Sequence, residues 1–198
     1  MTGKLFVISG PSGVGKGTIV SRIMNLDEDI YLSVSATTRK KREGEEEGVN
    51  YYFKSLEEFT NMIDKGEFLE YAQFCENYYG TPMGPVKEKL KNGKDIILEI
   101  EIQGAMQVKK NMPECVMIFI APPSFEELNS RLVGRGTETK EVIELRVATA
   151  KKELQFAKKY DYIVVNDEIE IATDKVLSII KAERCKKDRI IDDLEVLK

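Results

Sequence analysis

The sequence predicts an α/β protein in which helices cover both faces of a five-stranded parallel sheet. Short apolar runs alternate along the chain with longer stretches of helical spacing, which is typical of a parallel sheet wrapped by helices. These runs are rich in Ile and Val, which indicates strands that are buried on both faces. The length of 198 residues fits one core that carries small insertions.

The five predicted strands are distributed over most of the chain. They cover residues 5–9, 32–36, 95–100, 116–121 and 162–165. Cys115 directly precedes the fourth run, and we expect it to be a small buried hydrophobic residue.

Helix signals fall between these runs. One apolar helical face follows the first glycine-rich stretch and consists of Ile19, Val20, Ile23 and Met24. Helices should also begin near Ser55 and Ser124, because each has a Glu three residues later, the spacing of a capping box. Further helices are expected from about residue 85 to Gly93, from 139 onward and from about 171 to 185.

Two segments interrupt this alternation. Residues 37–83 carry aromatics, glycines and clustered charges, with strand-like pieces at 51–53 and 68–74. Residues 133–140 form a polar loop between two predicted helices. Insertions on a rigid scaffold often carry function, so we expect binding residues in both.

Composition excludes several classes of protein. The chain has 30 Lys and Arg against 34 Asp and Glu, and this net charge of −4 argues against a general nucleic-acid binder. It has no His, which excludes Ser-His-Asp and Cys-His nucleophiles, histidine metal sites and a histidine general base. The remaining chemistry must use carboxylates, Lys, Arg, hydroxyls, backbone amides or a bound ion.

Cysteine usage and hydropathy point to a compartment. The odd number and wide spacing of Cys75, Cys115 and Cys185 suit neither a disulfide framework nor a CxxC metal site, which favours a reducing cytosol. The sequence shows no signal-peptide pattern and no apolar run of membrane-spanning length. We therefore expect a soluble, cytoplasmic protein with no membrane or nucleic-acid partner; the sequence does not set its oligomeric state.

A phosphate-binding loop is the strongest motif. Gly10-Pro11-Ser12-Gly13-Val14-Gly15-Lys16 follows an apolar strand and opens a helix, which is the context that a P-loop requires. Its glycines allow backbone N–H groups to converge on phosphate oxygens at a helix N-terminus, and Lys16 adds a mobile positive charge. The sequence therefore predicts a nucleoside triphosphate site.

One position departs from that motif. Gly17 follows Lys16, where a Ser or Thr hydroxyl usually contacts Mg²⁺. Either Thr18 takes over this contact, or the ion is held by a carboxylate, the nucleotide phosphates and water.

A second anion site is one interpretation of the 35–53 stretch. Arg39, Arg42 and Tyr51 lie close together in sequence, and arginine presents a planar donor fork that matches phosphate. The alternative is a solvated charged loop, because four Glu residues between 43 and 47 nearly cancel the basic run.

Carboxylates beyond this stretch favour a ligand site. Glu70 lies in a strand-like piece, and residues 78–82 form a turn that bears hydroxyls. Glu99 and Glu101 are placed at i and i+2, on one face at the carboxyl end of a buried strand, where open α/β sheets bind ligands. Beside a triphosphate, such carboxylates must hold Mg²⁺, pair with a cation or accept hydrogen bonds from a base.

A set of stretches in a fixed order identifies a family. They are residues 10–16, 35–39, 42–44, 49–53, 68–70, 77–81, 101–104, 131–139 and 164–167. On these stretches the chain resembles the guanylate kinase family over nearly its whole length. The resemblance implies transfer of a phosphoryl group from ATP to GMP, with Mg²⁺ as the cofactor.

The resemblance also implies a P-loop kinase fold in three parts. The core would comprise residues 1–36, 84–125 and 151–198, the small mixed α/β GMP-binding insertion residues 37–83, and the lid residues 126–150.

It further implies a role for each residue that matches a family motif. The implied GMP phosphate ligands are Ser35, Arg39, Arg42, Tyr51 and Tyr79, and the implied guanine ligands are Glu70, Thr81 and Glu101. The implied ATP ligands are Pro11, Ser12, Gly13, Val14, Gly15, Lys16, Gly17, Thr18 and Asn166. The implied catalytic cations are Lys16, Arg39, Arg131, Arg135 and Arg146, and the implied metal contacts, direct or through water, are Thr18 and Glu99. Since the family often has Asp in one or both of the positions of Glu99 and Glu101, the division of these two residues between metal and guanine stays open.

Two alternatives come from other functional classes. Similar domains serve as catalytically inactive peptide-binding modules, but those lack the intact phosphate loop that this chain has. A kinase for another nucleoside monophosphate is the second alternative, and Glu70 with the 78–81 turn argues against it.

Overall fold

The computed structural model describes residues 2–74, 76–133 and 140–191. Its larger sheet is wholly parallel, with the order β2-β7-β1-β8-β9. These strands are β1 (Leu5–Ser9), β2 (Ile30–Leu32), β7 (Asp95–Glu99), β8 (Val116–Ala121) and β9 (Tyr162–Val165). The five-stranded parallel sheet predicted from the sequence is thereby confirmed.

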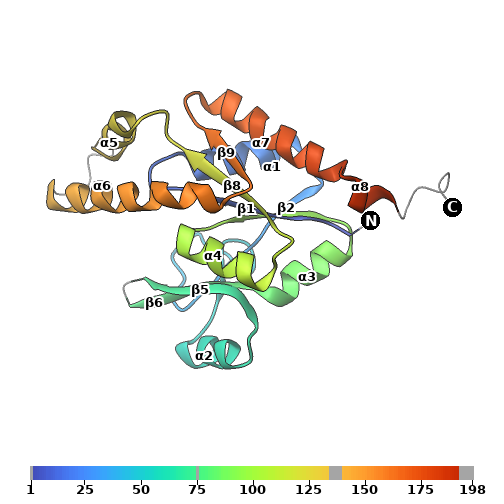
Figure 1. The fold of residues 1–198 in the computed structure, drawn as a ribbon. Helices are drawn as coiled ribbons and strands as arrows, with labels where there is room; N and C mark the ends of the chain where they lie inside the picture. Colours follow the sequence, from blue (N-terminus) through green and yellow to red (C-terminus); the bar gives the residue numbers. More distant parts are fainter. Residues whose placement is uncertain (1, 75, 134–139, 192–198) are drawn as a thin grey trace.

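Helices cover both faces of this sheet (Figure 1). The alternation of β1 sends Phe6 and Ile8 toward α1 (Lys16–Leu26) and α7 (Ile169–Arg184), where they join one buried cluster. Leu5 and Val7 point the other way, into a cluster with α3 (Met83–Lys91) and α4 (Ile102–Asn111). Cys115 belongs to this second cluster and is 2% exposed, as expected.

A smaller mixed sheet lies on the α4 side of the core (Figure 1). It has the order β4-β3-β6-β5, with β3 (Ala36–Thr37), β4 (Tyr52–Phe53), β5 (Phe68–Phe74) and β6 (Asn77–Pro82). Helix α2 (Leu56–Asp64) covers it and stacks Phe59 on Phe68, with ring centroids 4.4 Å apart. The predicted capping box of Ser55 and Glu58 starts this helix.

A helical pair carries the chain between β8 and β9. It comprises α5 (Phe125–Val133) and α6 (Lys140–Leu154), followed by the 3₁₀ turn η1 (Gln155–Lys159). The Ser124 hydroxyl accepts the Glu127 N–H at 3.1 Å, as the sequence spacing predicted. After α7, the short helix α8 (Lys187–Ile190) ends the described part of the chain. No helix in residues 2–74, 76–133 and 140–191 is long and apolar enough to cross a membrane.

Two strand predictions were wrong in part. The 32–36 run is not one strand, because β2 ends at Leu32 and the chain crosses to the smaller sheet, where the Ser35 carbonyl accepts the Tyr52 N–H at 2.9 Å. Strand β9 has the predicted bounds but is buried on one face alone. Ile163 and Val165 are exposed because β9 is an edge strand.

Candidate active site

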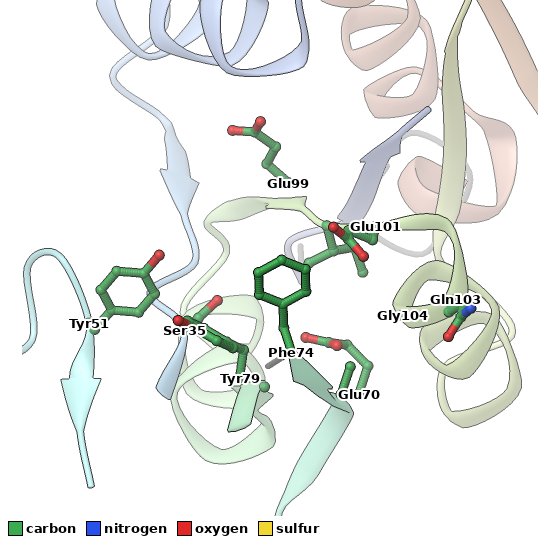
Figure 2. Close-up of a pocket in the computed structure, with 12 residues that line it drawn as sticks. Ser35, Tyr51, Glu70, Phe74, Tyr79, Glu99, Glu101, Gln103 and Gly104 are labelled. Carbon is green, nitrogen blue, oxygen red and sulfur yellow. The ribbon is translucent and has the colours of Figure 1, made fainter. Parts of the chain in front are cut away.

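A cavity of about 310 Å³ lies between the carboxyl end of the large sheet and the smaller sheet. The predicted acceptor residues that line it are Ser35, Tyr51, Glu70, Tyr79 and Glu101, together with Glu99 from the predicted metal side. Figure 2 shows Glu70 and Glu101 on one side of the cavity, and Tyr51 and Ser35 on the other. Residues from both sheets thus converge on one space.

Glu70 is the buried carboxylate of this cavity. It is 7% exposed, and its Oε1 accepts a hydrogen bond from the Thr81 hydroxyl on the neighbouring strand at 2.6 Å. Burial raises the pKa of Glu70; the Thr81 hydrogen bonds oppose that rise, and the charge of Glu101 adds to it. In the sequence analysis only the family resemblance linked Glu70 with Thr81. In the structure they are in contact because they are paired across the antiparallel strands β5 and β6.

Gly104 is a residue of this site that sequence reasoning missed. A Cβ at position 104 would lie 2.8 Å from Glu70 Oε2, so α4 can pass this close to the carboxylate only with glycine there. The glycine in the 101–104 motif was the available signal, but the partner that it approaches is far away in sequence.

Arg39 lies beside Tyr51, one of the aromatic residues that line the cavity. Its guanidinium carbon is 5.3 Å from the Tyr51 ring centroid, within range of a cation–π interaction. Both guanidinium edge nitrogens, Nη1 and Nη2, donate to Glu45, at 3.0 and 2.6 Å. Arg42 is exposed in the same turn, and its backbone N–H also donates to Glu45, at 2.8 Å.

The P-loop connects β1 to α1, in the predicted context. Gly13 and Gly15 adopt φ values of 85° and 90°, which are strained for side-chain-bearing residues. Lys16 begins α1, and its Nζ donates to the carbonyls of Gly10 and Pro11 at 2.6 and 3.0 Å. The ammonium therefore lies against the backbone of the loop itself.

Asn166 lies beneath this loop. Asn166 is 4% exposed, and its side-chain amide donates to the Val14 carbonyl at 2.7 Å. A Cβ at Gly15 would lie 2.5 Å from the same amide nitrogen. Asn166 thus braces the loop backbone, a contact that the sequence did not predict.

Glu99 stands at the end of β7, on the P-loop side of the cavity (Figure 2). A Cβ at Gly17 would lie 3.4 Å from Glu99 Oε1 and 3.7 Å from Oε2. The side chain is exposed within the open cleft; desolvation by the surrounding protein raises its pKa, and Lys16 opposes that rise. Thr18 is exposed on the first turn of α1.

The helical pair brings one arginine to the P-loop and another to Asn166. Arg146 Nη2 on α6 donates to the Ser12 hydroxyl at 3.0 Å. Arg131 on α5 donates from Nη1 to the Asn166 carbonyl at 3.1 Å and pairs with Glu127 through Nε. Arg135 lies outside the described residues.

A family model described as guanylate kinase matches residues 2–183. This chain belongs to the guanylate kinase family. A guanylate kinase from Halalkalibacterium halodurans is 56% identical over 190 residues, which cover 96% of this chain and 93% of the relative. One from Shouchella clausii is 53% identical over 189 residues, covering 96% and 92%.

A solved structure is similar in fold as well as in sequence. The crystal structure of guanylate kinase from Anaplasma phagocytophilum superposes with a TM-score of 0.74 at 36% identity, covering 95% of this chain and 89% of that one. Together with the sheet order, this similarity confirms the predicted P-loop kinase fold of the guanylate kinase family.

Proposed function

We propose that this chain transfers the γ-phosphoryl group of ATP to GMP, giving ADP and GDP, with the P-loop as the donor site and the cavity as the acceptor site. The observation that carries the proposal is the buried Glu70 carboxylate, which accepts a hydrogen bond from Thr81 in a cavity that Glu99 also lines, and Glu99 lies next to Gly17 at the start of α1. Membership of the guanylate kinase family supports the same reaction.

Guanine fits this carboxylate and adenine does not. Guanine presents N1–H and the 2-amino group side by side, two donors that an ionised carboxylate can accept. Adenine presents a bare N1 acceptor to the same oxygens, so Glu70 would receive no hydrogen bond from the base in a closed site. We assign Glu70, Thr81 and Glu101 to the base.

The GMP phosphate would lie at the opposite end of the cavity. Tyr51, Tyr79 and Ser35 bring hydroxyls there, and Arg39 stacks against the Tyr51 ring. We assign these four residues and Arg42 to that phosphate, because charge-assisted hydrogen bonds from arginine are the strong contacts of phosphate sites.

ATP would bind along the P-loop. We assign its phosphates to residues 11–18, with Lys16 as the mobile cation and Asn166 as the residue that supports the loop. Helix α1 begins at Lys16 with Gly15 as its N-cap, so the backbone N–H groups of its first turn would donate to the ATP phosphates, where the helix dipole favours negative charge.

The reaction needs no general base. The attacking atom is an oxygen of the GMP phosphate, which is already ionised, so the absence of His costs nothing. Catalysis then consists of aligning donor and acceptor and neutralising charge on the transferred group. Lys16, Arg39, Arg131, Arg135 and Arg146 are the cations that we assign to this task.

Mg²⁺ fits beside Glu99 and Thr18. The ion takes oxygen ligands, usually one or two carboxylates together with nucleotide phosphates and water. No group of three or more candidate metal-ligating side chains occurs among the described residues, so one carboxylate next to the phosphates is the arrangement that fits. Gly17 leaves the Glu99 oxygens room there, and the ion would neutralise charge on the phosphates when bound.

Replacing Glu70 with glutamine should lower kcat/KM for GMP at least roughly tenfold, the loss expected for one charged hydrogen bond. Glutamine keeps the size of the side chain but replaces one acceptor with a donor, so the preference for GMP over AMP should narrow as well. Initial rates with GMP and AMP at saturating ATP measure both effects. An unchanged GMP to AMP ratio would mean that guanine is recognised elsewhere.

The same carboxylate should give an acid limb to kcat/KM for GMP. Burial raises the pKa of Glu70 above its ordinary 4.5, so the carboxylate is lost at a higher pH than usual as pH falls. GMP binding, which needs the ionised form, should weaken through that pH range. The limb should be missing in Glu70→Gln, whereas ionisation of the GMP phosphate affects both enzymes equally.

Replacing Glu99 with glutamine should raise the Mg²⁺ concentration for half-maximal turnover by roughly tenfold or more. Calorimetric titration of Mg²⁺ into the enzyme with bound ATP provides a readout that is independent of turnover. Glu28→Gln removes an exposed carboxylate distant from the cavity and should behave as wild type. Equal Mg²⁺ affinity in Glu99→Gln and wild type would remove Glu99 from the metal site.

A further inference from the structure

Glu45 makes a close, two-pronged contact with Arg39. Arg39 Nη1 donates to Glu45 Oε2 at 3.0 Å, and Nη2 donates to Oε1 at 2.6 Å. The two side chains are only 15% and 18% exposed, so this ion pair is unlike a mobile surface pair. Glu45 Oε2 also accepts the backbone N–H of Arg42 at 2.8 Å, which closes the turn between the two arginines.

The contact with Glu45 uses the Nη1–Nη2 edge of the Arg39 guanidinium and not its Nε–Nη2 edge. Arg39 Nη1 also donates to the Lys40 carbonyl at 2.9 Å, so these contacts engage both of its N–H groups. A guanidinium has five N–H donors in a fixed fork. The two that these contacts do not engage, Nε–H and the second N–H of Nη2, share the adjacent edge, which matches two phosphate oxygens.

Two aromatic rings pack near the Arg39 guanidinium. Its carbon lies 5.3 Å from the Tyr51 ring centroid and 6.0 Å from that of Phe53. Tyr51 meets Tyr79 edge to face at 6.1 Å, and both tyrosines line the cavity. Arg39 is therefore fixed at one edge by Glu45 and on its face by Tyr51, next to the hydroxyls of the acceptor site.

We propose that Glu45 is a positioning residue for GMP, which holds Arg39 with its Nε edge toward the acceptor phosphate. This inference rests on the proposed function, because it presumes that GMP binds in the cavity. Hydrogen bonds from Arg39 and the Arg42 backbone lower the pKa of Glu45 to about 2, so the carboxylate is ionised at every pH used for assay. Glu45 therefore acts as a permanent anchor.

Orientation and charge have opposite effects at this site. A fixed carboxylate repels the incoming phosphate, and if repulsion dominated, removing the charge would strengthen GMP binding. If orientation dominates, removing the charge frees Arg39 to leave its position, and GMP binding weakens. The two-pronged geometry favours orientation, since Glu45 uses the edge that the phosphate does not need. The sign of the change in GMP affinity decides between these effects.

The test compares Glu45→Gln with Glu43→Gln, which makes the same charge change at an exposed position of the same loop. We expect the KM for GMP and the calorimetric Kd for GMP without ATP to rise about tenfold in Glu45→Gln. The KM for ATP should change less than about twofold, and Glu43→Gln should match wild type. Glu45→Asp, which keeps the charge on a shorter stem, should recover part of the GMP affinity.

A double-mutant cycle separates positioning from general damage to the loop. If Glu45 acts through Arg39, adding Glu45→Gln to Arg39→Ala should not weaken GMP binding further. A full additional loss in the double mutant would show a merely structural role, and tighter GMP binding in Glu45→Gln would show that Glu45 competes with the phosphate. Either result, or no change, overturns the inference. Failure of the wild-type enzyme to phosphorylate GMP would instead overturn the proposed function.

Discussion

Replacing Arg146 with alanine should lower kcat by about 10³-fold or more, the range found for cations that engage a transferring phosphoryl group. Arg146 donates to the Ser12 hydroxyl at 3.0 Å, so α6 brings its guanidinium to the P-loop that we propose as the phosphate site. The effect should fall on the transition state, where charge on the transferred group must be neutralised. Steady-state kinetics at saturating ATP and GMP measure it.

Arg22→Ala is the matched control for this substitution. Arg22 lies on α1 in an exposed pair with Glu170, so its loss should leave kcat within about twofold of wild type. A rise in the KM for ATP with kcat intact in Arg146→Ala would make Arg146 a simple binding contact.

Replacing Lys16 with methionine should lower kcat by roughly 10²- to 10³-fold, the loss typical of removing one preorganised donor from a developing charge. Methionine keeps much of the stem but loses the ammonium that now rests on the Gly10 and Pro11 carbonyls. Single-turnover measurements with enzyme in excess over GMP separate this chemical step from product release. Circular dichroism should be unchanged, because the lysine stem is not part of either buried cluster.

Lys175→Met provides the control, since Lys175 is exposed on α7, away from the P-loop. Turnover in Lys16→Met above a few per cent of wild type would remove Lys16 from its proposed role.

Features that depend on local pattern were predictable from the sequence. Strand β8 coincides with the apolar run predicted at residues 116–121, and α2 begins directly after the predicted capping-box residue Ser55. Both signals lie within a few neighbouring residues. The P-loop was predictable for the same reason: strand, glycines, Lys16 and helix are contiguous.

Features that depend on long-range contacts were not predictable. Charge counting showed that the glutamates at 43–47 offset the basic residues at 39–42. It could not identify Glu45 as the glutamate that forms the ion pair with Arg39. Likewise, β5 and α4 must pack together before Gly104 meets Glu70. The edge position of β9, which exposes Ile163, depends on the whole sheet order.

Transfer of label from γ-³²P-ATP tests the central claim most directly. With Mg²⁺ and equal concentrations of GMP, AMP and dTMP in one reaction, the label should appear in the β-phosphate of GDP. One labelled GDP should form for each ADP released from ATP. Label released mainly as inorganic phosphate, or distributed into ADP or dTDP at rates similar to that into GDP, would contradict phosphoryl transfer to GMP at this site.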